Sequence, residues 1–152
     1  MKKMISLVLS LLMAMSFCIC IPAAAEENGI IVSTSYEYID DETYFVTTII
    51  EYPSKGSISG SKTTSYVSSN TTQWTYTING TFSYNGSSSS CTSVSDSYSI
   101  SNSNWHMDSH SCWKSGNTAN RTVTMKHKVL GVTINTVTRS LVLSCSPNGT
   151  LS

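Results

Sequence analysis

Residues 72–86, TQWTYTINGTFSYNG, carry the clearest strand pattern in the chain. The large apolar side chains of this stretch fall only on even positions: Trp74, Tyr76, Ile78, Phe82 and Tyr84. Asn79-Gly80 is a common two-residue hairpin turn, but a turn there would place Ile78 and Thr81 on the same face and break the alternation. We therefore predict one long strand over 73–84, with Gly80 at a bend or bulge and the turn at Asn85-Gly86.

The rest of the chain repeats this alternation in shorter runs. Thr, Val, Ile and Tyr recur at every second position, and Gly, Asn, Ser or Pro separate the runs. The runs cover 42–52, 61–68, 91–100, 104–113, 117–130 and 132–145, and the polar run 61–68 suits an edge strand. We predict an all-β, immunoglobulin-like antiparallel β-sandwich of seven or eight strands, with a closed β-barrel as the alternative.

The first 25 residues have the features of a bacterial signal peptide. The basic start MKK precedes an apolar run from Met4 to Ile21, and the small residues PAAA (22–25) precede the acidic EENG. We expect cleavage after Ala25, with an uncleaved N-terminal anchor as the alternative. The sequence then predicts a secreted protein with a single domain over residues 26–152.

The charge of the mature chain excludes one class of partner. Removing Lys2 and Lys3 leaves seven basic and nine acidic side chains, a net charge of −2. No basic stripe remains to follow a phosphate backbone, so we expect no nucleic-acid binding. No second apolar stretch is long enough to span a membrane, so we expect no membrane association after the leader is removed.

Three cysteines remain after the leader: Cys91, Cys112 and Cys145. Export permits disulfides, and three cysteines allow one bridge in three possible pairings. A bridge between Cys91 and Cys145 would close the largest loop and would contribute about 4 kcal/mol if its geometry were suitable.

The motif NWHMDSHSCW (104–113) places four metal-ligand side chains at alternate positions: His106, Asp108, His110 and Cys112. On a strand these share one face, but alternate residues lie about 6.6–6.8 Å apart, so one ion can take at most two neighbours. We therefore interpret the motif as the solvated face of a strand whose Trp105 and Met107 pack inward. A metal site that uses His106, Asp108 and His110 is the lesser alternative, and we expect no cofactor.

The remaining motifs do not support catalysis. The chain has no G-x-S-x-G elbow and no glycine-rich phosphate loop, and YIDDE (38–42) lacks the order of a calcium loop. We predict a non-enzymatic protein. Sandwich domains often bind sugars on exposed aromatic rings, and the candidates are Trp113, Tyr36, Tyr38 and Tyr66. The expected partner is an extracellular glycan or a cell-surface protein.

Four phrases carry a family resemblance: DETYFVTTI (41–49), WTYTINGTFSYNGSSSSCTS (74–93), KSGNTA (114–119) and LSCSPNGTLS (143–152). Together they resemble a family of small secreted proteins from gut clostridia and other Firmicutes, which is catalogued as a domain of unknown function. The resemblance implies an exported, β-rich, single-domain protein and carries no activity. It also implies that Cys91 pairs with Cys145. It supplies no His, Asp or Cys within 104–113, so Cys112 is an addition of this chain.

Taken together, these features predict a secreted, non-enzymatic binding or interaction module of a Gram-positive bacterium. A secreted antibacterial, bacteriocin-like effector is the alternative function, because size and export fit it equally well. A metal-binding protein that uses His106, Asp108 and His110 is the third.

Overall fold

The computed structural model describes residues 29–54 and 56–152. This part of the chain folds entirely as β-structure, and it contains no helix that could cross a membrane. The strands are β1 (Ile30–Tyr38), β2 (Thr43–Ser54), β3 (Ser57–Ser68), β4 (Thr71–Tyr84), β5 (Ser89–Ile100), β6 (Trp105–Ser115), β7 (Thr118–Val129) and β8 (Val132–Ser144). The predicted signal peptide, residues 1–25, lies outside the described residues.

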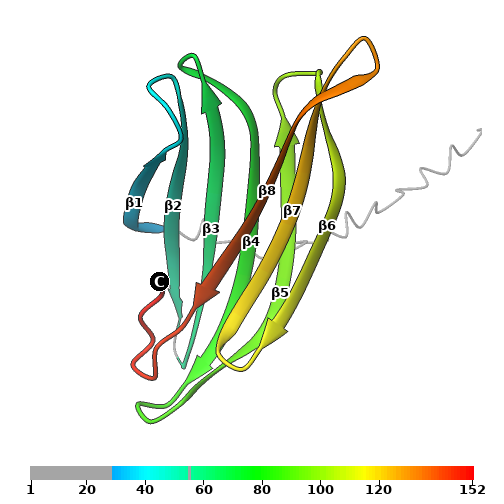
Figure 1. The fold of residues 1–152 in the computed structure, drawn as a ribbon. Helices are drawn as coiled ribbons and strands as arrows, with labels where there is room; N and C mark the ends of the chain where they lie inside the picture. The colour runs from blue at the N-terminus through cyan, green and yellow to red at the C-terminus, as the bar shows by residue number, and fades with distance from the viewer. Residues whose placement is uncertain (1–28, 55) are drawn as a thin grey trace, which may run out of the picture.

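The strands form two antiparallel sheets that face each other (Figure 1). Strands β1 to β5 make a five-stranded sheet and β6 to β8 make a three-stranded sheet. The predicted all-β sandwich is therefore confirmed, and the two sheets do not join into the alternative closed barrel. Within each sheet every strand pairs with its neighbours in sequence, so each sheet is a meander and the order differs from the Greek-key order of immunoglobulin domains.

Strand β4 confirms the interpretation of the 72–86 pattern. Its core-facing side chains Trp74, Tyr76, Ile78 and Phe82 are each at most 1% exposed. Asn79-Gly80 lies inside the strand, where a Cβ at position 80 would come within 2.7 Å of the Phe82 ring. The predicted turn lies at Asn85-Gly86, where Gly86 has a φ of +86°. Gly80 pairs in regular register with Gly60 and Val94, so the predicted bulge is not at Gly80. The bulge lies on β5, where Thr92 has no partner residue in β4.

The run 61–68 is not an edge strand, which corrects the prediction. It belongs to β3, the central strand of the five-stranded sheet. Its polar outer face pairs hydroxyl to hydroxyl with β4: Thr63 contacts Thr77 at 2.9 Å and Ser65 contacts Thr75 at 2.9 Å. Cross-strand hydroxyl pairs of this kind stabilise the solvated face of a sheet. The polar residues of 61–68 therefore mark the outer face of a central strand and do not mark an edge strand.

The smaller sheet covers only part of the larger one. Strand β8 packs on β3 and β4, whereas β1 and β2 make no close backbone approach to the described strands of the other sheet. All nine residues of β1 are accordingly exposed. We call the β1–β2 pair the overhang, because it extends beyond β8 at the open side of the sandwich (Figure 1).

Candidate ligand-binding site

A β-bulge in β6 divides the motif NWHMDSHSCW. In the pairing with β7, Met107 lies opposite Met125 and Ser109 lies opposite Thr124, so Asp108 has no partner residue. One extra residue reverses the alternation of the side chains that follow it. The prediction that the four candidate ligands of the motif share one face is therefore wrong.

The three candidate metal ligands point in two directions. His106 lies opposite Lys126, and the Lys126 ammonium forms an exposed ion pair with Asp108 at 2.8 Å. His110 lies beyond the bulge, opposite the buried Val123, and faces the other sheet. Within the part of the chain that the structure describes, no three side chains of His, Cys, Asp or Glu gather where they could hold one ion.

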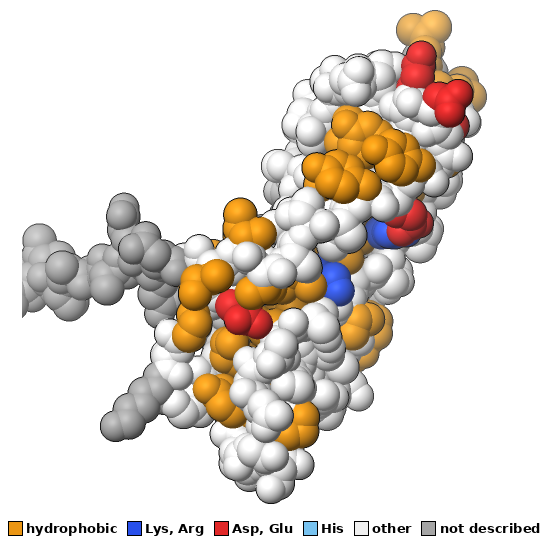
Figure 2. All heavy atoms as spheres, turned by 90° about the vertical axis from the view of Figure 1, so that its left-hand side faces the viewer, with side chains coloured by type: hydrophobic (Ala, Val, Ile, Leu, Met, Phe, Trp, Pro, Cys, Tyr) orange, Lys and Arg blue, Asp and Glu red, His pale blue; other side chains and the backbone are white. Residues whose placement is uncertain are grey.

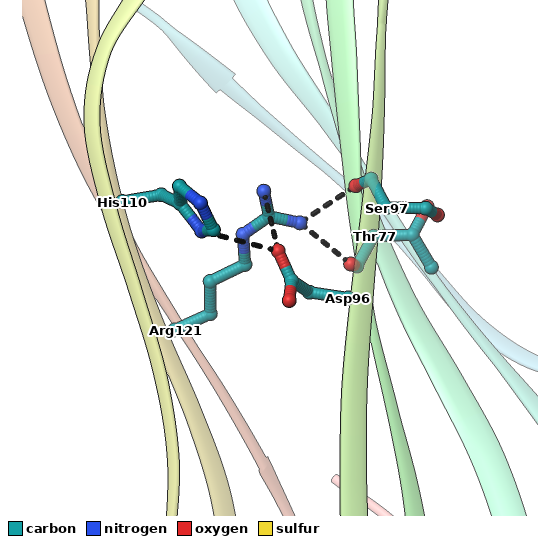
Figure 3. Close-up of polar contacts among 5 residues, drawn as sticks. All are labelled: Thr77, Asp96, Ser97, His110 and Arg121. Atoms are coloured by element: carbon teal, nitrogen blue, oxygen red, sulfur yellow. Dashed lines mark hydrogen bonds and ion pairs between the residues drawn. The ribbon is translucent and has the colours of Figure 1, made fainter.

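His110 belongs instead to a polar cluster between the sheets (Figure 3). Arg121 is 0% exposed, and its Nη2 lies 2.9 Å from Oδ2 of Asp96. Its Nη1 donates hydrogen bonds to the backbone oxygens of Thr77 at 2.8 Å and Ser97 at 2.6 Å. Nδ1 of His110 lies 3.4 Å from the same Asp96 oxygen. The cluster joins β4 and β5 to β6 and β7, and it acts as a cross-link between the sheets.

The predicted Cys91–Cys145 disulfide is absent from the structure, in which Cys91, Cys112 and Cys145 are all free. The two buried thiols point at nearby carbonyls of their own segments: Cys91 donates to Ser93 at 3.2 Å and Cys145 donates to Ser146 at 3.3 Å. Burial raises the pKa of all three thiols, and the Asp96 charge raises that of Cys112 further. A nucleophilic thiol requires the opposite shift.

The predicted aromatic candidates do not form one site. Trp113 is 46% exposed on the outer face of the smaller sheet. Tyr36 and Tyr38 are exposed on β1 and pack around Tyr44, with ring centroids 6.1 and 5.4 Å away. Tyr66 is only 6% exposed, and it alone among the four lines a pocket between the sheets.

The residues that line this pocket lie in or near the β1–β2, β3–β4, β5–β6 and β7–β8 turns. These four turns are at the same end of the sandwich (Figure 1). A meander places alternate turns at the same end, so residues far apart in sequence meet there. The pocket has a volume of about 300 Å³ and is lined by Asp40, Thr43, Tyr66, Ser68, Gln73, Trp105, His127 and Asn135. Its volume is at the lower end of the ~300–1,000 Å³ that small-molecule sites occupy.

Aromatic rings form the base of the pocket. Trp105 stacks on His127, with ring centroids 5.0 Å apart and an interplanar angle of 11°. Tyr66 stacks on Trp74 at 5.2 Å and meets Trp105 edge to face at 5.2 Å. Because each ring is fixed by another ring, the imidazole of His127 and the phenol of Tyr66 are held in place before any ligand arrives.

One buried polar atom in the pocket lacks a protein partner. Nε2 of His127 is buried and has no hydrogen-bond partner among the described residues. The Asn135 side chain is exposed at the mouth. Burial raises the pKa of Tyr66, and the charge of Asp40 raises it further, so the phenol and the carboxylate lie close enough to interact. The pocket thus combines an imidazole, an amide, a phenol and a carboxylate, which are donors and acceptors of hydrogen bonds.

Comparison of the chain with protein-family models, with curated proteins and with solved structures gave no match. The resemblance to the family of small secreted clostridial proteins stays a prediction. Of the pocket residues, the sequence singled out only Tyr66 as a binding candidate. Asp40, His127 and Asn135 belong to different strands or turns, and no motif or spacing connects them.

Proposed function

We propose that the protein is a secreted, non-enzymatic module of a Gram-positive bacterium that binds carbohydrate in the pocket at the turn end of the sandwich. The observation that carries the proposal is the buried, unpartnered Nε2 of His127 beside the Asn135, Tyr66 and Asp40 side chains. A buried polar atom without a partner costs free energy, and a ligand hydroxyl would satisfy it.

A sugar fits this chemistry better than an apolar ligand does. Each sugar hydroxyl both donates and accepts a hydrogen bond, and the pocket offers acceptors on Asp40 and both kinds of group on Asn135 and Tyr66. The rings of Trp105 and Tyr66 supply an apolar base for the C–H face of a sugar ring. Export, which the leader predicts, would bring the pocket to the glycans of a cell surface.

Absence of enzymatic activity is part of the proposal. The raised pKa of Cys112 disfavours the thiolate that a cysteine nucleophile requires. His110 contacts the carboxylate of Asp96, which already pairs with the buried Arg121. The His110–Asp96 contact therefore has a structural explanation.

The test is a glycan array followed by titration of the best glycan against the purified protein, with tryptophan fluorescence as the readout. Each neutral hydrogen bond lost should weaken binding by about 3–10-fold, so Asn135→Ala and His127→Ala should each show a loss of this size. Trp113→Ala, on the outer face of the smaller sheet, is the control and should bind normally. Binding that the two pocket variants leave unchanged, or no binding to any glycan, contradicts the proposal.

One observation favours the alternative of an antibacterial effector. The tip of the β7–β8 hairpin is apolar and exposed: Val129 at 42%, Leu130 at 100%, Val132 at 63% and Ile134 at 59%. Exposed apolar side chains at a loop tip can enter the interface of a bilayer. Dye release from vesicles of phosphatidylglycerol and phosphatidylethanolamine, lost in Leu130→Asn, would favour the effector, and intact vesicles would oppose it.

A further inference from the structure

A groove runs along the open side of the sandwich, between the overhang and the C-terminal residues 150–152, which lie beside the edge of β8 at Ser144. Its volume is about 440 Å³, and its apolar walls include Val32, Ile49 and Leu151. Figure 2 views the molecule from this side and shows apolar side chains gathered over the overhang, with few charged groups among them. The inner faces of β3, β4 and β5 are covered by the smaller sheet, but this part of the larger sheet has no strand above it.

The edge of β8 is already paired at Ser144 with the C-terminal residue Ser152, which belongs to no strand. Ser144 exchanges two backbone hydrogen bonds with Ser152, at 2.9 and 3.0 Å. Backbone groups alternate in direction along a strand, and the register of β8 with β7 is regular from Ser144 to Asn135. The N–H and C=O groups of Val142, Ser140 and Thr138 therefore point to the same free edge as those of Ser144.

We propose that an extended segment of a partner protein binds in this groove as a fourth strand of the smaller sheet, paired with the β8 edge at Val142 and Ser140. Edge strands offer unpaired backbone groups to such segments, and strand addition of this kind is a common mode of peptide recognition. The inward side chains of the segment would contact Val32 and Ile49 of the overhang.

Lys62 indicates the charge of the segment. Its Nζ donates a hydrogen bond to the backbone oxygen of Val142 at 2.9 Å, so it caps the free edge. Within residues 29–54 and 56–152, no carboxylate lies within 4.0 Å of it to form an ion pair. Burial lowers the pKa of this ammonium. Glu51 also lines the groove, but its carboxylate accepts a hydrogen bond from the Leu151 N–H at 2.8 Å. A segment with an inward Asp or Glu would pair with Lys62 and release the Val142 oxygen for the new strand.

The shape of the groove favours a single strand over a second copy of this chain. If two β8 edges paired antiparallel about a two-fold axis, both overhangs would project across the shared edge into the same space. A lone strand has no second layer and avoids this collision. At its other end the groove is closed by the ion pair of Arg139 with Glu37, which links β8 to β1, so the segment is short.

The test uses the peptide acetyl-Ser-Val-Thr-Glu-Thr-Val-Ser-amide, whose two Val and one Glu side chains share a face when it is extended. Its binding to the full protein is followed by NMR, together with the hydrogen exchange of the Ser140 and Val142 amides. We expect both amides to exchange more slowly with the peptide bound. A peptide with Lys in place of Glu should bind about tenfold more weakly, because it brings a like charge to Lys62.

Two variants at one position separate strand pairing from other contacts. Ser140→Pro removes an edge N–H that β7 does not use, and proline is tolerated at such edge positions. Ser140→Ala loses the same hydroxyl contact with Thr122 but keeps the N–H. The peptide should bind the alanine variant normally and the proline variant at least about tenfold more weakly.

Equal binding of the peptide to both variants would overturn the proposal, and so would failure of the Glu peptide to bind the unmodified protein. An unchanged melting temperature of Ser140→Pro shows that this variant is folded, so that a loss of peptide binding is not caused by unfolding. If the protein sediments as a dimer that Ser140→Pro dissociates, the occupant of the edge is a second copy and the partner segment is refuted. Pocket variants such as His127→Ala should leave peptide binding unchanged.

Discussion

Removing Asp96 should destabilise the fold far more than removing any exposed carboxylate. Arg121 is 0% exposed, and its only carboxylate partner among the described residues is Asp96 at 2.9 Å. A guanidinium cannot lose its proton at ordinary pH, so Asp96→Ala leaves a full charge in the core. Breaking a buried pair in this way costs about 3–5 kcal/mol. Because Asp96 is itself 21% exposed, we expect the lower limit, about 3 kcal/mol.

The effects of substituting Asp96 and Arg121 on the free energy of unfolding should also be strongly non-additive. Replacing both members with apolar residues removes the stranded charge, and such replacements are often neutral. The double variant Asp96→Ala/Arg121→Met should therefore be more stable than Asp96→Ala alone, although it carries one more substitution. Direct contact of the two side chains at 2.9 Å is the physical reason for the coupling.

The measurement is urea unfolding followed by the fluorescence of Trp74 and Trp105, which are 1% and 4% exposed. For a domain of this size a loss of 3 kcal/mol corresponds to a melting temperature lower by about 10–15 °C. Asp108→Ala is the matched control, since its ion pair with Lys126 is equally short but exposed, and it should cost about 0–1 kcal/mol. Equal losses for Asp96→Ala and Asp108→Ala, or additive behaviour of the double variant, would refute the assignment of a structural ion pair.

The shifted pKa values of Glu37, Cys112 and Tyr66 can each be tested with one substitution. A hydrogen bond from Arg139 holds the pKa of Glu37 below its ordinary value of 4.5, so the ionised Glu37 stabilises the fold above that pH and the stabilisation is lost as pH falls. The free energy of unfolding of Glu37→Gln should therefore depend less on pH between about 5 and 3 than that of the unmodified protein. An unchanged pH dependence contradicts a stabilising Arg139–Glu37 ion pair. Asp96 helps to raise the pKa of Cys112, so alkylation of Cys112 should begin at higher pH than in a free peptide and at lower pH in Asp96→Asn, with Asp108→Asn as the unshifted control. Asp40 helps to raise the pKa of Tyr66, so Asp40→Asn should lower that pKa in an ultraviolet titration, and no change would contradict an interaction between the Asp40 charge and the phenol.

The fold was predictable because strand periodicity is a local signal. The even-numbered apolar residues of 73–84 identified β4 and placed its turn at Asn85-Gly86, against the usual meaning of Asn79-Gly80. The position of each strand within its sheet was harder to predict. The run 61–68 looked like an edge, since its outward hydroxyls are as polar as loop residues. Yet those hydroxyls contact the hydroxyls of β4, and β3 is the central strand of a sheet whose other face is buried.

The chemistry of 104–113 could not be read correctly without the bulge. A strict alternation groups His106, Asp108 and His110, but a single unpaired residue at position 108 separates them. Nothing in the local sequence marks that residue, because the bulge is a property of the pairing with β7. The pocket at the turn end could not be predicted for a related reason, since Asp40, His127 and Asn135 meet only when two sheets stack.

The meander and the unequal sheets together explain why both proposed sites lie where they do. Pairing in sequence order brings four of the turns to one end of the sandwich, so the pocket is built from turn-end residues of both sheets. A division into five and three strands leaves β1 and β2 of the larger sheet with no strand packed above them, and beside them the β8 edge is free beyond Ser144. The pocket and the groove share no lining residue. A glycan and a partner strand could therefore bind at the same time, and the protein could link a cell surface to another protein without any change in its own fold.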